Sequence, residues 1–124
     1  KLMTRLYTSR PAGETWPPNR AALAVPHLEY LDAREQNSAA YAAELARAYQ
    51  ALGDLDKAAA KAKRACTIAP YDANLRELFA TILLQTSDLK GAEHQIVALT
   101  KLEPDRAIHA KRLEAIRKRL AEQN

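Results

Sequence analysis

Cysteine, glycine and phenylalanine are scarce in this chain of 124 residues, which has one cysteine, three glycines and one phenylalanine. The lone Cys66 excludes an intramolecular disulfide and the paired cysteines of zinc and haem sites. The isolated glycines exclude a phosphate-binding loop and a dinucleotide fingerprint. No run of apolar residues approaches the roughly 20 that a membrane-spanning helix needs, so we expect no membrane insertion.

Apolar residues, alanine above all, are abundant and make up 48% of the chain, while 27% of the residues are charged. This mixture favours closely packed helices over a β-sandwich or barrel, which needs more β-branched and aromatic residues. The length is that of a single domain. We therefore predict one all-α domain that is stabilised by packing alone.

The net charge of +4 is unevenly distributed, because both ends of the chain are basic and its middle is mildly acidic. A solvated surface accounts for this pattern. The cations of residues 111–119 leave open a weak attraction to nucleic acid or an anionic surface. No aromatic residue accompanies them for base stacking, so nucleic acid is not the partner that we expect.

The chain repeats itself with a period of 34 residues, which separates Pro70 from Pro104. Two aligned blocks result, residues 39–72 and 73–106, and we place the second repeat at 73–104. In each block apolar residues recur at helical spacing on both sides of a break at Gly53-Asp54 or Ser87-Asp88. Each block is therefore predicted to be two helices and a turn.

Small and capping residues occupy equivalent places in the two blocks. Ala46 and Ala58, like Ala80 and Ala92, are placed where two antiparallel helices cross closely. We expect Asp54 and Asp88 to cap the second helix of each pair and the two prolines to end it.

The first block resembles the tetratricopeptide repeat in the order and spacing of its signature residues, which are Leu45, Ala46, Tyr49, Gly53, Asp54, Ala58, Ala65 and Pro70. The second block matches more loosely, through Phe79, Ala80, Leu83, Ala92, Leu99 and Pro104. It has Ser87 where glycine is usual, and Ala42 and Arg76 stand where the family often has tryptophan. The resemblance implies a right-handed α–α superhelix, the tetratricopeptide solenoid.

The same register predicts the flanking segments. Residues 21–36 are expected to be a half repeat, its second helix only, which Pro26 either kinks or delays to a start near Leu23. Residues 105–124 are expected to be a C-terminal capping helix with an apolar stripe. Residues 1–20 contain several prolines together with the apolar Leu2, Leu6, Tyr7 and Trp16, so we predict an extended strap, or alternatively a disordered tail.

No catalytic motif is present, so we predict no enzyme activity, cofactor, metal or small-molecule substrate. His27-Leu28-Glu29 is similar to the H-x-E of zinc deaminases, whose cysteine pair this chain lacks. We expect His27, His94 and His109 to be surface histidines and Cys66 to be a small apolar filler. The cations Lys57, Lys61, Lys63 and Arg64 are expected to form a solvated convex face.

The resemblance further implies that the first helices of successive repeats line a short concave groove for a peptide. The groove residues expected here are Glu44, Arg47, Gln50, Glu77, Thr81, Gln85, Lys111, Arg112 and Lys118. The subclass that clamps a terminal carboxylate is not supported, because Ala43 and Arg47 replace its lysine and asparagine. An ordinary solvated helix face is the alternative.

These observations predict a non-catalytic scaffold that binds a protein or peptide. Because the chain begins with Lys1 and ends on a capping helix, we expect it to be the C-terminal part of a larger bacterial protein. The alternative is an accessory folding, docking or dimerisation domain of an enzyme whose catalytic domain lies upstream. Self-association through the N-terminal half repeat, whose apolar end is open, is a further expectation.

Overall fold

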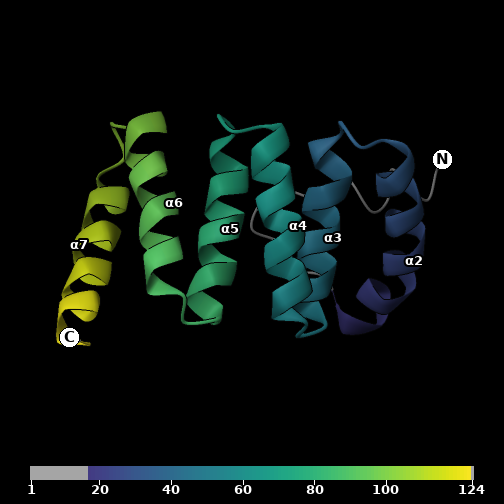
Figure 1. The fold of residues 1–124 in the computed structure, drawn as a ribbon, viewed down its shortest axis with the longest axis horizontal. Coiled ribbons are helices and arrows are strands. Elements are labelled where there is room, and N and C mark those ends of the chain that lie inside the picture. The colour runs from purple at the N-terminus through teal and green to yellow at the C-terminus, as the bar shows by residue number, and fades with distance from the viewer. Residues whose placement is uncertain (1–16, 124) are drawn as a thin grey trace.

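A computed structural model describes residues 17–123, and these form six α-helices and no strand. In chain order they are α2 (Pro18–Arg34), α3 (Ala39–Ala51), α4 (Leu55–Ile68), α5 (Ala73–Gln85), α6 (Leu89–Leu102) and α7 (Ala107–Glu122). The helices stand side by side in this order, with the connections alternating between their two ends (Figure 1). The predicted all-α class is confirmed. In this part of the chain, no helix has the length and apolar character that crossing a membrane requires.

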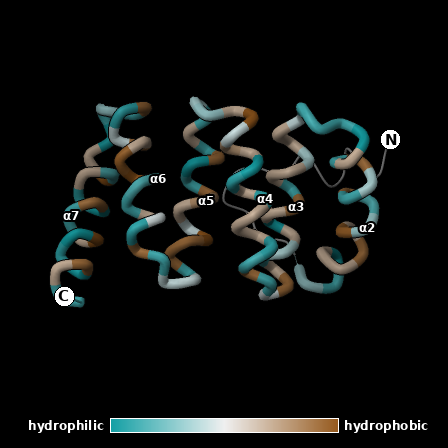
Figure 2. Tube along the Cα trace, in the orientation of Figure 1, coloured by the Kyte–Doolittle hydropathy of each residue, from teal (hydrophilic) through white to brown (hydrophobic). Residues whose placement is uncertain are grey.

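Packing joins each helix to the next one in the chain, and α3 also contacts α5. Residues 39–72 contain α3 and α4, and residues 73–104 contain α5 and α6. Ala46, Ala58, Ala80 and Ala92 are all fully buried. Because their side chains are single methyl groups, neighbouring helix axes can approach closely. Figure 2 shows hydrophobic and hydrophilic residues interleaved along the helices, as expected of helices with one buried face.

The turns inside the two blocks have matching caps. A carboxylate oxygen of Asp54 accepts a hydrogen bond from the Lys57 backbone N–H at 3.3 Å, and Asp88 accepts one from Gly91 at 2.9 Å. Both predicted N-caps are thus confirmed. The residue before each cap has a positive φ, 81° at Gly53 and 64° at Ser87. Glycine adopts this conformation without steric cost, whereas serine does not.

Helix α2 begins earlier than the sequence indicated. An extended segment is predicted for residues 1–20. Residues 1–16 lie outside the described residues, and residues 18–20 belong to the helix Pro18–Arg34. A late start near Leu23 is therefore wrong. Pro18 occupies the first helical turn, where its missing N–H costs no hydrogen bond, and the extended Pro17 precedes it. Pro26 lies inside the helix on its exposed side, where water can reach the backbone carbonyl that loses a donor.

The C-terminal helix α7 buries Ile116 against α6, and Leu113 and Leu120 pack beside it. His109, at the start of α7, was expected at the surface and is instead buried, with 1% exposure. It occupies the register position of Leu75, which is also buried. Its Nε2 atom lies 2.7 Å from a carboxylate oxygen of Glu103, and this polar contact makes its burial tolerable.

Candidate functional site

The nine predicted groove residues lie on α3, α5 and α7, and hydrogen bonds connect these three helices. The Gln50 side-chain amide donates to Gln85 at 2.7 Å, which joins α3 to α5. Arg112 donates to both carboxylate oxygens of Glu77, at 2.6 and 2.8 Å, which joins α7 to α5. We call this surface, defined by the nine residues, the first-helix face.

On α3 the first-helix face is mostly buried. Arg47 donates to Glu44 at 2.9 Å, and the two side chains are only 11% and 3% exposed. A buried carboxylate beside a guanidinium one helical turn away is charge-compensated within its own helix. Glu44 therefore offers little surface to a ligand, while Gln50 at the end of α3 is more open.

On α5 and α7 the bidentate pair of Glu77 and Arg112 determines the local charge and the pKa of Glu77. Partial burial alone would raise the pKa of Glu77, but the hydrogen bonds and charge of Arg112 outweigh burial and lower it. Thr81 donates its hydroxyl to the Glu77 backbone carbonyl at 2.9 Å. Glu77 is thus an ionised carboxylate that is already neutralised by Arg112.

Lys111 and Lys118 remain as uncompensated charges on the first-helix face. Both are exposed, and neither forms an ion pair with a residue in the described range 17–123. The other cations of this face, Arg47 and Arg112, are paired with Glu44 and Glu77. The face therefore has a net positive charge at its α7 end.

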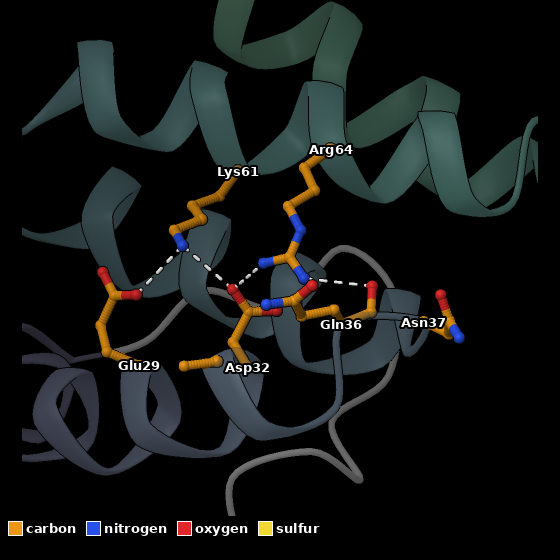
Figure 3. A pocket seen from close by; sticks show the side chains of 7 residues that line it. Glu29, Asp32, Gln36, Asn37, Lys61 and Arg64 are labelled. Atoms are coloured by element: carbon orange, nitrogen blue, oxygen red, sulfur yellow. Dashed lines mark hydrogen bonds and ion pairs between the residues drawn. The ribbon is translucent and has the colours of Figure 1, made fainter.

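A second polar cluster, which the sequence reasoning missed, joins α2 to α4 (Figure 3). Asp32 is buried, with 2% of its side chain exposed, and one of its oxygens pairs with both Lys61, at 3.0 Å, and Arg64. Lys61 also lies 3.0 Å from Glu29. The expectation that Lys61 and Arg64 form a solvated face is wrong, because both side chains bend toward the buried carboxylate. Lys57 and Lys63 of the same helix are exposed.

Tyr49 extends this cluster to α3. Its hydroxyl donates a hydrogen bond to Glu29. Burial, together with the neighbouring carboxylate, raises the pKa of Tyr49 to about 12. Burial raises the pKa of Glu29, but hydrogen bonds from Tyr49 and Lys61 lower it overall. The pKa of Lys61 is raised because its carboxylate partners outweigh the opposing effect of burial. We call Glu29, Asp32, Tyr49, Lys61 and Arg64 the polar clamp.

All residues of the polar clamp except Tyr49 line a surface pocket of about 440 Å³, yet their two carboxylates and two cations compensate one another. Among the described residues, no group of three or more histidine, cysteine or acidic residues is arranged to hold a metal ion. The clamp is therefore best understood as a structural tie between α2, α3 and α4. One signal in the sequence could have revealed it: Asp32 lies one period before Cys66, a position expected to be apolar.

Cys66 is buried, and burial raises the pKa of its thiol to about 11. A thiol with a raised pKa holds little of the reactive thiolate at neutral pH. The description of Cys66 as an apolar filler agrees with this environment.

The fold defines an all-α domain of helices packed in chain order. Neither a protein-family model nor a curated protein sequence matches the chain. Among solved structures, a chain from a T3SS complex of Aeromonas hydrophila is similar, with a TM-score of 0.73 and 19% sequence identity. The match covers 83% of this chain and 73% of that chain. At this identity the similarity concerns the fold.

Proposed function

We propose that this chain is a tetratricopeptide-type module that binds a protein or peptide partner and has no catalytic role of its own. In this proposal α3 to α6 form two full repeats of a right-handed α–α superhelix, α2 is a half repeat and α7 is the cap. The proposal is supported by equivalent environments one period apart: Ala46 and Ala80 are fully buried, and Asp54 and Asp88 are both N-caps.

The first-helix face is the proposed binding surface, and its charge indicates the partner. The observation that carries this assignment is the pair of unneutralised lysines, Lys111 and Lys118, beside the compensated Glu77 and Arg112. A partner segment with acidic residues over α7 would complement them. A chain of similar fold is part of a T3SS complex, which supports a role in holding protein partners.

The test is to reverse the two lysines together, Lys111→Glu and Lys118→Glu, and to quantify partners recovered by affinity capture followed by cross-linking. We expect recovery to fall about tenfold, because long-range attraction to an acidic segment becomes repulsion. Lys101→Glu, an exposed charge reversal on α6 outside the first-helix face, is the matched control and should retain its partners. Equal recovery with the double variant and the control would contradict the assignment.

A further inference from the structure

We propose that the cleft between α4 and α6 is a second docking site, which takes an apolar side chain that lies next to an acidic residue on a partner protein. It shares no residue with the first-helix face. Two adjoining hollows of about 300 and 400 Å³ form it, and both are lined by Lys63, Phe79, His94 and Gln95.

The cleft is open because the residues around it are small. Ala59 and Ala60 of α4 and Gly91 of α6 line the larger hollow, and Leu83 of α5 lies between these helices. Leu83 is only 7% exposed, and the Asp88 carboxylate lies against Gly91. A ligand in this hollow would therefore contact mainly the alanine methyl groups and the partly buried Phe79 ring. Apolar surface of this kind, recessed between helices, gains free energy when a partner's apolar side chain displaces water from it.

The preceding junction, one period earlier, has a pocket of about 440 Å³ in register with the smaller hollow, but its space in register with the larger hollow is filled. Lys57 stands at the register position of Gly91, and Tyr49 stands at that of Leu83. The Lys57 ammonium lies 5.6 Å from the centroid of the Tyr49 ring, so its stem covers the aromatic side chain. At the second junction no long side chain extends from position 91, and the short carboxylate of Asp88 lies against Gly91 instead.

The same comparison indicates the charge of the partner residue that the cleft would bind. Glu29, at the register position of Lys63, supplies a carboxylate to Lys61 across the first junction. At the second junction this acid is replaced by Lys63, and neither Lys63 nor His94 pairs with an acid in the described range 17–123. The carboxylate of Asp88 lines the larger hollow and caps α6. Arg76 lines the smaller hollow and donates to Gln95 and to the Pro70 backbone carbonyl. With Lys63 and Arg76 against the one carboxylate of Asp88, the lining of the two hollows has a net positive charge and complements an acidic residue.

The test uses the whole chain, labelled with nitrogen-15, and the acetylated hexapeptide Glu-Asp-Leu-Phe-Asp-Glu in an NMR titration. We expect the amide signals of Ala60, Leu83 and Gly91 to shift together, with a dissociation constant of about 1 mM, since one or two side chains make the contact. A peptide with lysine in place of each acid, and one with serine in place of leucine and phenylalanine, should each bind at least about fivefold more weakly.

Two pairs of variants locate the site. Lys63→Glu should weaken binding about fivefold through charge reversal, whereas Lys111→Glu, on the first-helix face, should leave it within about twofold. Ala60→Phe should abolish the shifts by filling the cleft, whereas Ala40→Phe, at an exposed alanine of α3, should not. The well-dispersed spectrum of each variant reports that it is folded.

Absence of shifts at Ala60, Leu83 and Gly91 would overturn the proposal, and so would equal binding of the acidic and basic peptides. Shifts on α3, α5 and α7 that are lost with Lys111→Glu but kept with Lys63→Glu would also overturn it, while supporting the first-helix face. The two proposed sites therefore fail or succeed independently.

Discussion

The junction between α2 and α4 and the junction between α4 and α6 occupy the same place in consecutive periods but hold different chemistry. At the first junction Asp32 ties Lys61 and Arg64 together, and Tyr49 adds a hydrogen bond to Glu29. At the second junction the residues in register with Asp32, Lys61 and Tyr49 are Cys66, Gln95 and Leu83. Ion pairs bridge α2 and α4 beside a pocket of about 440 Å³ at the first junction, whereas among the described residues no ion pair bridges α4 and α6 beside the two hollows of the second.

This difference shows which positions the packing requires and which it leaves free. The alanines at the helix crossings are fully buried in both blocks, so close approach of the axes depends on them. The residues around the crossings can be a charged clamp or an apolar cleft without changing the helix order. Function can therefore differ between junctions that share one architecture.

Removal of the buried carboxylate of Asp32 is expected to give the largest change in the free energy of unfolding. Asp32→Ala should lower the free energy of unfolding by about 3 kcal/mol, because Lys61 and Arg64 lose the partner that compensates their partial burial. Urea denaturation followed by circular dichroism measures this change. A loss below about 0.5 kcal/mol, the usual size for a surface substitution, would mean that the clamp does not tie the helices together.

Replacing residues of the first junction by those found one period later tests this prediction more strictly. Asp32→Cys, Lys61→Gln and Arg64→Ala together convert the first junction to the residues of the second, which are Cys66, Gln95 and Ala98. We expect this triple variant to recover at least about half of the stability that Asp32→Ala loses, since both cations are removed with their buried partner and only the more exposed Glu29 loses an ion pair. If the triple variant is less stable than Asp32→Ala, the two junctions are not interchangeable.

An intermediate effect on stability is expected from Tyr49→Phe. This change removes a hydroxyl that the second junction lacks, because Leu83 stands at the equivalent position there. At neutral pH the loss of the hydrogen bond to Glu29 should cost about 1.5 kcal/mol. Because the pKa of Tyr49 is raised from 10.0 to about 12, this stabilisation is complete below pH 10 and is lost as the pH rises toward 12. Wild-type and variant stabilities should therefore converge over that range in alkaline urea titrations. A constant difference would contradict the assigned hydrogen bond.

The smallest expected effect concerns the turns, where the two blocks also differ. Ser87→Gly should raise stability by about 0.5 to 1 kcal/mol, because Ser87 has a φ of 64° that glycine adopts without strain. The reciprocal change, Gly53→Ser, should lower stability by a similar amount at its φ of 81°. Thermal unfolding of the two variants provides the measurement, and a shift of the same sign in both would contradict this explanation.

The helices were largely predictable from the sequence, because apolar spacing and capping residues act locally. Asp54 and Asp88 mark helix starts whatever the helices pack against, and both were found as caps. The start of α2 differs from the prediction because a proline such as Pro26 usually indicates a helix start or a kink, whereas here Pro17 and Pro18 mark the start. A proline inside a helix is tolerated when its side of the helix is exposed to water, and exposure is not visible in the sequence.

The polar clamp was not predictable in the same way. Periodicity assigns a residue to a helix face, but the long side chains of Lys61 and Arg64 reach across the gap between helices to a partner roughly one period away. His109 was misjudged for a related reason, since its burial depends on the carboxylate of Glu103 from the preceding turn. The open cleft beside Gly91 likewise follows from what surrounds that residue.

The packing of each helix almost exclusively on its chain neighbours also determines how the molecule yields to force. Detachment of α7 removes support from α6 and breaks the Arg112–Glu77 pair with α5, but leaves α2 and α3 untouched. Traction on the C-terminus is then relieved one helix at a time, in several small steps, and each detached helix can fold back onto the stack that remains. We therefore expect this chain to extend in steps under load and to refold when the load is removed.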